Sequence, residues 1–195
     1  IIGKTISVKE LEEKGFKGIF VGSGAGLPNF MDIPGENLIN IMSSNEYLTR
    51  VNLMDAANPK TDTPVILGKK VIVVGGGNTA MDSCRTAKRL GADVTLVYRR
   101  SEAEMPARLE EVKHAKEEGV NFLTLHNPKE YLADEDGRVK AAVLDVMKLG
   151  EPDASGRRRP ESTGETVTME CDRVIGAGGV SPNPLVPNSI EGVEL

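Results

Sequence analysis

The fold of this chain is decided by one stretch, Val71-Ile72-Val73-Val74-Gly75-Gly76-Gly77-Asn78-Thr79-Ala80-Met81-Asp82. Its four apolar, mostly β-branched residues predict a buried strand. Its three glycines predict a tight turn, and the residues after them suit a helix. The small residues follow the pattern G-x-G-x-x-A, which is typical of turns that bind a dinucleotide between a strand and a helix. The stretch therefore predicts a nucleotide-binding α/β domain.

Each small residue of this pattern has a steric role. Gly75 allows the tight turn, Gly77 lets the backbone approach a pyrophosphate, and Ala80 lets the helix pack closely against the strand. A pyrophosphate at this helix N-terminus would meet unpaired N–H groups and the positive end of the helix dipole. The residues predicted to hold it are Gly75, Gly76, Gly77, Asn78, Thr79 and Ala80.

The end of the next predicted strand, residues 93–98, indicates which dinucleotide binds. NAD-binding domains place an acidic residue there, about 20 residues after the glycines, to bond the ribose 2′-hydroxyl. This chain has Arg99 and Arg100 instead, and guanidinium groups suit a 2′-phosphate. The alternative is that both arginines are solvated or pair with Glu102 or Glu104. We predict NADP(H) rather than NAD(H).

Two further glycine-containing segments follow short β-branched runs. No apolar helix follows residues 22–25, so they suit either close approach of the backbone to a flat ligand or a plain turn. Residues 177–179 would let a cofactor or a neighbouring domain lie against the backbone, or would form a flexible exit loop. Arg108 is either a third phosphate contact or a surface arginine. The candidate cofactor-binding residues of the two segments are Gly22, Ser23, Gly24, Ala25, Ala177, Gly178 and Gly179.

Hydrophobic periodicity places the glycine turn in a βαβ unit. The predicted elements are strands at 18–22, 71–74, 93–98, 120–125 and 173–175 and helices at 43–53, 78–90 and 105–119. Ser44 is the predicted cap of the first helix, and Leu109, Val112 and Ala115 form an apolar stripe on the last. Three segments alternate like antiparallel strands, at 129–132, 139–149 and 166–169. The predicted class is α/β, a Rossmann-like parallel sheet with helices and an added antiparallel β-meander.

Composition narrows the class of protein. Of the 195 residues, 39% are hydrophobic and 27% are charged, as in an ordinary globular protein, and the net charge of −5 indicates no nucleic-acid partner. No apolar run reaches the roughly 18 residues that span a bilayer, and no signal peptide is evident, so we expect a cytoplasmic protein without a membrane partner.

The sequence contains no evident catalytic or metal-binding set. Cys84 and Cys171 are not a C-x-x-C pair, and two cysteines cannot hold an iron–sulfur cluster on their own. His114 and His126 lack co-ligands at metal spacing. We therefore predict no metal site and no catalytic side chain, because the chemistry of hydride transfer belongs to the cofactors.

Several segments together resemble the small (β) subunit of NADPH-dependent glutamate synthase. They are Val73–Asp82, Val97–Ala107, Glu110–Val112, Glu117–Val120 and Gly150–Arg159, and the resemblance runs over nearly the whole chain. The family's organisation implies an FAD domain interrupted by an NADP(H) domain. Proline-rich segments at 57–64 and 181–187 suit such boundaries. The implied domains are a partial FAD segment at 1–57, the NADP(H) domain at 58–181 and a return to the FAD domain from 182 to 195.

The same resemblance implies a function in electron input. NADPH would pass hydride to FAD, and electrons would leave through iron–sulfur clusters to the large glutamate synthase subunit for glutamate biosynthesis. One alternative is the FAD subunit of a ferredoxin–NADP oxidoreductase, bifurcating or sulfide dehydrogenase-like, with a ferredoxin-linked flavoprotein as partner. Another is a non-catalytic nucleotide-binding module. The family's FAD fingerprint and cysteine-rich segment are absent, so we expect this fragment to hold FAD weakly and to be inactive alone.

Overall fold

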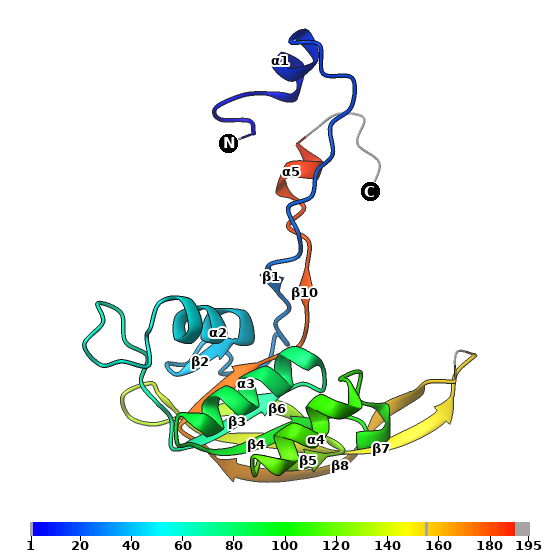
Figure 1. Cartoon of the computed structure of the whole chain (residues 1–195). Helices are drawn as coiled ribbons and strands as arrows, with labels where there is room; N and C mark the ends of the chain where they lie inside the picture. Colours follow the sequence, from blue (N-terminus) through cyan, green and yellow to red (C-terminus); the bar gives the residue numbers. More distant parts are fainter. Residues whose placement is uncertain (1, 155, 190–195) are drawn as a thin grey trace. The chain divides into compact units, whose positions relative to one another are not determined.

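A computed structural model describes residues 2–154 and 156–189 of the chain (Figure 1). It contains two compact units. The larger one is Phe30–Gly179, and the smaller one combines Ile1–Asn29 with Val180–Leu195.

The larger unit is built on a parallel sheet in the order β2-β9-β3-β4-β5. The strands are β2 (Ile41–Ser43), β9 (Arg173–Gly176), β3 (Lys70–Val74), β4 (Asp93–Tyr98) and β5 (Asn121–Thr124). Three helices cover one face of this sheet, namely α2 (Ser44–Leu53), α3 (Asn78–Arg89) and α4 (Leu109–Glu117) (Figure 1). Helix α3 links β3 to β4, and α4 links β4 to β5, which gives two βαβ units.

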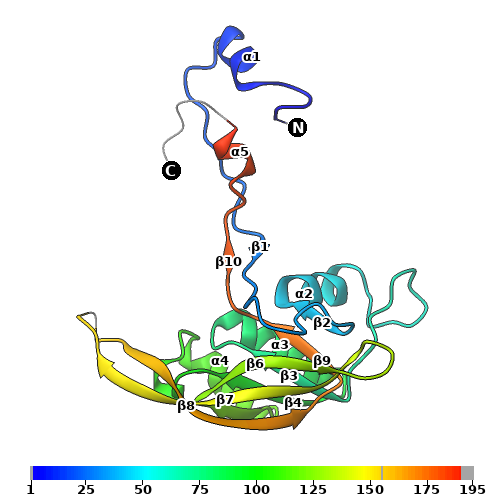
Figure 2. The same ribbon diagram turned by 180° about the vertical axis from the view of Figure 1, so that it is seen from behind.

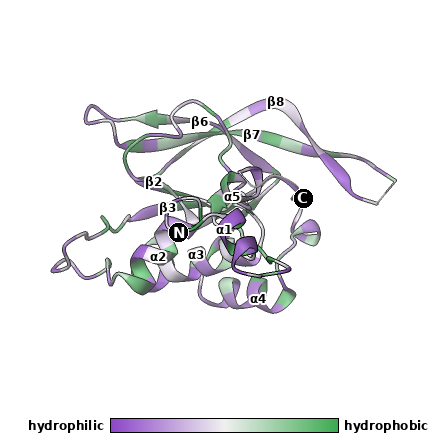
Figure 3. Ribbon diagram, turned by 90° about the horizontal axis from the view of Figure 1, so that it is seen from above, coloured by the Kyte–Doolittle hydropathy of each residue, from purple (hydrophilic) through white to green (hydrophobic). Residues whose placement is uncertain are grey.

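An antiparallel sheet covers the opposite face of the parallel one. Its strands are β6 (His126–Ala133), β7 (Val139–Pro152) and β8 (Arg158–Glu170), in that order. Figure 2 shows this sheet from behind, and Figure 3 shows the helices and the antiparallel sheet on opposite sides of the parallel strands. The predicted β-meander is therefore present, and it forms the third layer of the unit.

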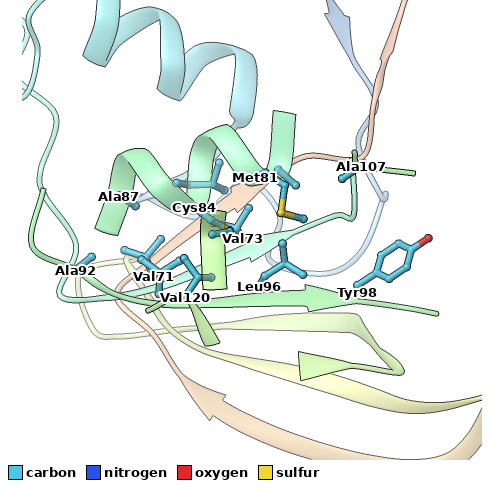
Figure 4. Packing of buried hydrophobic residues seen from close by; sticks show 14 of the residues in the cluster. Val71, Val73, Met81, Cys84, Ala87, Ala92, Leu96, Tyr98, Ala107 and Val120 are labelled. Atoms are coloured by element: carbon cyan, nitrogen blue, oxygen red, sulfur yellow. The ribbon is translucent and has the colours of Figure 1, made fainter. Parts of the chain in front are cut away.

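Strand β3 shows why the opening stretch is apolar throughout. Val71 and Val73 pack with the helices, whereas Ile72 and Val74 pack with the antiparallel sheet. Because successive side chains point to opposite faces of a sheet, a strand covered on both sides needs apolar residues at every position. Figure 4 shows the helix-side packing, in which Met81 and Cys84 of α3 lie over Val73 and its neighbours.

Four predicted details of the elements were wrong. Helix α4 begins only at Leu109, because Pro106 favours an extended backbone at Met105, where ψ is 130°. Leu109 is 88% exposed and does not belong to the apolar stripe. Ser43, not Ser44, caps α2, since its hydroxyl accepts a hydrogen bond from the Glu46 N–H at 3.2 Å. Strand β8 is also longer than predicted and extends to the tip of its hairpin with β7.

The smaller unit contains little regular structure. Helix α1 (Val8–Glu13) begins with a capping box formed by Ser7 and Glu10. Strand β1 (Leu27–Pro28) pairs antiparallel with β10 (Val180–Ser181), and α5 spans Leu185–Asn188. The strand predicted at residues 18–22 does not form, because these residues pair with no other strand in the described chain.

The compact units and the predicted domains do not share boundaries. The segment between Phe30 and residue 57 supplies β2 and α2 to the larger unit, where β2 pairs with β9. The division at residues 57/58 and 181/182 concerns the full-length protein, and it stays a prediction.

Two leucines, one buried and one exposed, test which residues form the core. Leu144 is fully buried between the two sheets, so Leu144→Ala should lower the free energy of unfolding by about 2–5 kcal/mol. Leu109→Ala removes the same atoms from an exposed site and should change it by less than about 0.5 kcal/mol. Urea denaturation measures both. Equal effects would contradict the assignment of Leu109 to the surface.

A charge cluster joins α3 to the end of α4 and gives stability a pH dependence. Glu118 accepts hydrogen bonds from Arg89 at 2.6 Å and from Arg85 at 2.9 Å. Arg89, helped by Arg85, holds the pKa of Glu118 below its ordinary value of 4.5. In the window between these two pKa values the unfolded chain binds more protons, so stability falls as the pH is lowered through it.

We expect Glu118→Gln to lower stability at pH 7 by up to about 1 kcal/mol. The difference from the native chain should vanish once the pH has fallen well below 4.5. Denaturation curves at several pH values measure this, with the more exposed Glu117→Gln as control. A difference that persists at low pH would show that packing, and not charge, is responsible.

Candidate dinucleotide-binding site

The glycine turn lies where β3 ends and α3 begins, and backbone atoms meet closely there. Gly75 has a φ of 145°, and a Cβ at this position would lie 2.5 Å from the carbonyl oxygen of Ala177. The Ala177 N–H donates to the Val74 carbonyl at 2.7 Å, and the Gly75 N–H donates to Val97 at 3.0 Å. The start of the segment after β9 therefore lies directly against the glycine turn. The small side chain of Ala177 suits this close contact.

The next two glycines differ in their surroundings. A Cβ on Gly76 would lie 2.6 Å from the ring of Tyr98, so this glycine is required by packing within the protein. Gly77 is the N-cap of α3, and nothing lies within 4 Å of the position its Cβ would take. This open space is where a ligand can approach the backbone. Ala80, in the first turn of α3, is fully buried, as the pattern predicts.

The start of α3 offers free hydrogen-bond donors. Within the described residues, the N–H groups of Gly77, Asn78 and Thr79 have no partner. Unpaired N–H groups at the first turn of a helix, together with the helix dipole, form an anion site. The geometry of this turn therefore suits a phosphate group.

Two arginines at the end of β4 form no ion pair with an acidic side chain in the part of the chain that the structure describes. Of the two predicted alternatives, pairing of Arg99 or Arg100 with Glu102 or Glu104 is not formed in the described residues, whereas solvation fits the exposed Arg99. Glu102 pairs with Lys116 at 2.5 Å, and Glu104 has partners of its own. Arg99 is exposed, and the Nε of Arg100 is buried without a hydrogen-bond partner in the described chain. A ligand oxygen would satisfy this donor.

The loop from β4 to α4 is fastened to the glycine turn. The Ala107 N–H donates to the Gly76 carbonyl at 3.1 Å, and the Arg108 N–H donates to the Asn78 side chain at 2.9 Å. The Tyr98 hydroxyl donates to the Glu104 carbonyl at 3.0 Å. Figure 4 shows the Tyr98 ring at the end of β4, near Ala107.

Sequence reasoning missed these anchors and found only part of the role of Asn78. Its carboxamide oxygen accepts a hydrogen bond from the backbone of Arg108, whose side chain is exposed. The signal that Tyr98 covers Gly76 is absent from local sequence, because the two residues meet only through the pairing of β3 with β4.

The other candidate residues are distributed over both units. Gly178 and Gly179 follow Ala177 and are exposed in the larger unit. The segment Gly22-Ser23-Gly24-Ala25 belongs to the smaller unit, and its proposed approach to a flat ligand stays a prediction.

The cysteines and histidines form no second site. Cys84 and Cys171 are free and lie in different core clusters, and burial raises the pKa of both thiols, that of Cys171 to about 12. Among the residues described, no three His, Cys, Asp or Glu side chains are placed to hold a metal ion. No helix of the described chain has the length and apolar character needed to cross a membrane.

Comparison with known proteins assigns a family. A family model for pyridine nucleotide-disulphide oxidoreductases matches residues 2–195. The chain belongs to this family. FprA of Mycobacterium tuberculosis, solved in complex with NADPH, has the same fold with a TM-score of 0.77 at 18% identity, over 94% of this chain and 54% of that one. The predicted α/β class is confirmed, and NADP(H) and FAD are cofactors in keeping with this oxidoreductase family.

Two curated relatives of this oxidoreductase chain are named as a subunit and a small chain, and both are longer than this chain. It is 42% identical over its whole length to the NADPH-Fe(3+) oxidoreductase subunit beta of Geobacter sulfurreducens. It is 36% identical over its whole length to the glutamate synthase [NADPH] small chain of Halomonas elongata, which confirms the predicted resemblance. The chain spans 28% of the first relative and 41% of the second.

Matched substitutions at two glycines separate packing from ligand approach. Gly75→Ala places a methyl group against a backbone oxygen at a positive φ and should lower the free energy of unfolding by at least about 1–3 kcal/mol. Gly77→Ala meets open space and should leave stability within about 0.5 kcal/mol. It should nevertheless weaken NADPH binding by roughly tenfold or more, about 1.4 kcal/mol. Thermal unfolding and calorimetry measure the two effects. Undiminished binding by Gly77→Ala would place the pyrophosphate elsewhere.

Proposed function

We propose that this chain is the NADPH-binding portion of a flavin oxidoreductase that passes hydride from NADPH to FAD in the full-length protein. The observation that carries the proposal is that an open glycine turn and two arginines occur at the same edge of the parallel sheet. The glycine turn follows β3 and the arginines follow the neighbouring strand β4, at the carboxyl ends where α/β sheets bind their ligands.

The charges at the site favour NADP(H) over NAD(H). A ribose 2′-hydroxyl is bound by a carboxylate, but the two nearest in the loop, Glu102 and Glu104, are occupied by Lys116 and Arg158. A 2′-phosphate would meet Arg99 and the unpartnered Nε of Arg100. The pyrophosphate would accept hydrogen bonds from the first turn of α3.

The residues of this chain would position the nicotinamide nucleotide and hold its charges. Bound FAD would supply the acceptor for the hydride, and the segment Gly22-Ser23-Gly24-Ala25 is the part of this chain proposed to approach it. Hydride transfer needs no acid or base from the protein, which agrees with the absence of a catalytic set in the sequence.

Two relatives support different candidates for the electron acceptor beyond the flavin. The name of the Halomonas elongata relative, a glutamate synthase [NADPH] small chain, supports the first candidate, electron transfer to a glutamate synthase large subunit. Iron–sulfur clusters on that route are part of the proposal. The name of the Geobacter sulfurreducens relative, which is more similar in sequence, supports an NADPH-dependent oxidoreductase that does not form glutamate. The second candidate is of this kind, a ferredoxin–NADP oxidoreductase. A full-length preparation that is reduced by NADPH and forms glutamate with its partner would favour the first candidate. Reduction of Fe(3+) or ferredoxin without glutamate formation would favour the second.

Arginine substitutions test the choice of nucleotide. Arg99→Ala and Arg100→Ala should each weaken NADPH binding by roughly tenfold, since one charge-assisted hydrogen bond contributes about 1.5 kcal/mol. NADH binding should stay unchanged, because NADH has no 2′-phosphate. Calorimetry with both nucleotides measures the ratio, and Arg159→Ala, on the exposed part of β8, is the control. An unchanged ratio in both variants would contradict the proposed role of these arginines.

A further inference from the structure

The loop that carries the two arginines contains a carboxylate with an unusual set of partners. Ser101 begins the short helix η1 (Glu102–Glu104), and its N–H and hydroxyl donate to Oε2 of Glu104 at 3.2 and 3.0 Å. The Nε of Arg158 donates to the other oxygen, Oε1, at 3.1 Å. Both oxygens of Glu104 are therefore engaged, one within the loop and one by a residue 54 positions away in the sequence.

Arg158 comes from the far end of the long hairpin of β7 and β8. The turn at its tip is fixed by two hydrogen bonds between Asp153 and Arg157, at 2.9 and 3.1 Å, and by Gly156 at a φ of 78°. Arg158 lies opposite Pro152 as the first residue of β8. This geometry brings its side chain to η1, whereas the side chains of Arg157 and Arg159 make no ion pair within the described residues.

Glu104 creates an electrostatic problem for the site. Although its partial burial acts in the opposite direction, the hydrogen bonds from Ser101 and Arg158 lower the pKa of Glu104, so this side chain is a carboxylate at neutral pH. It lies four positions after Arg100, in the loop that would surround a 2′-phosphate. An uncompensated carboxylate there would repel the phosphate and compete with it for the arginines.

We propose that Arg158 is a positioning residue that makes this loop selective for a 2′-phosphate. It neutralises Glu104 and holds it against Ser101, so that Arg99 and Arg100 stay available to the ligand. The hairpin thus takes part in nucleotide choice without touching the nucleotide. The inference rests on the proposed function, since it assumes that the loop binds NADP(H).

The test compares two probes that differ by one phosphate, 2′,5′-ADP and 5′-AMP, bound to the full chain. Arg158→Ala should weaken 2′,5′-ADP binding by roughly two- to fivefold, the scale of one partly exposed charge pair. Binding of 5′-AMP should not change. Arg158→Lys, which keeps the charge, should restore most of the affinity, and the neighbouring Arg157→Ala should have no effect.

A second substitution separates this role from a structural one. If Arg158 acts by neutralising Glu104, Glu104→Gln in the Arg158→Ala background should recover binding of 2′,5′-ADP, because the repelling charge is gone. If the pair only stabilises the loop, the double variant should bind no better than Arg158→Ala, and both probes should weaken equally. That result would overturn the inference.

Different results would overturn the proposed function and the role of Arg158. Absence of 2′,5′-ADP binding by the native chain would overturn the proposed function itself. Native binding with an unchanged ratio of the two probes in Arg158→Ala would overturn only the role of Arg158.

Discussion

The contact on which the larger unit depends is the approach of two backbones where β3 and β9 end. Gly75 and Ala177 lie so close that a single added carbon at Gly75 would clash with a carbonyl oxygen. This contact sets the direction in which the chain enters α3, and thereby the direction of the free N–H groups at its start. Gly76 is constrained in a similar way, because a Cβ there would clash with the ring of Tyr98. Gly77 alone is left open, so the turn is closed by protein on two sides and accessible on the third.

The three-layer arrangement explains why the ligand site lies at the strand ends. Helices fill one face of the parallel sheet and the antiparallel sheet fills the other. A ligand can then reach the backbone only at an edge, and the carboxyl edge of a parallel sheet presents the helix N-termini and the loops that follow each strand. Arg99, Arg100 and the glycine turn converge there because β3 and β4 are neighbours in register.

The sequence predicted the parts of this site that depend on local chemistry. A β-branched run, a glycine pattern and a pair of arginines give β3, α3 and the end of β4, because each depends on residues that are close in the chain. The contacts that it did not predict join distant segments. Tyr98 over Gly76 requires the sheet register, and Arg158 beside Glu104 requires the length and twist of a hairpin. The late start of α4 at Leu109 was predictable from Pro106, but the surrounding helical periodicity outweighed it.

The strand order has a consequence for how this chain folds. Strand β9 lies beside β3 in the parallel sheet, and Val71 of β3 pairs with Arg173 of β9. Strand β9 is nevertheless the last strand of this sheet to be synthesised. Pairing of residues so far apart in sequence forms slowly, because a long loop must be closed first. Until β9 is in place, β3 has an unpaired edge and the glycine turn lacks Ala177 as its support. A nascent chain can therefore contain the whole glycine pattern and still lack the fixed turn, which is complete only after about a hundred further residues have been translated and folded.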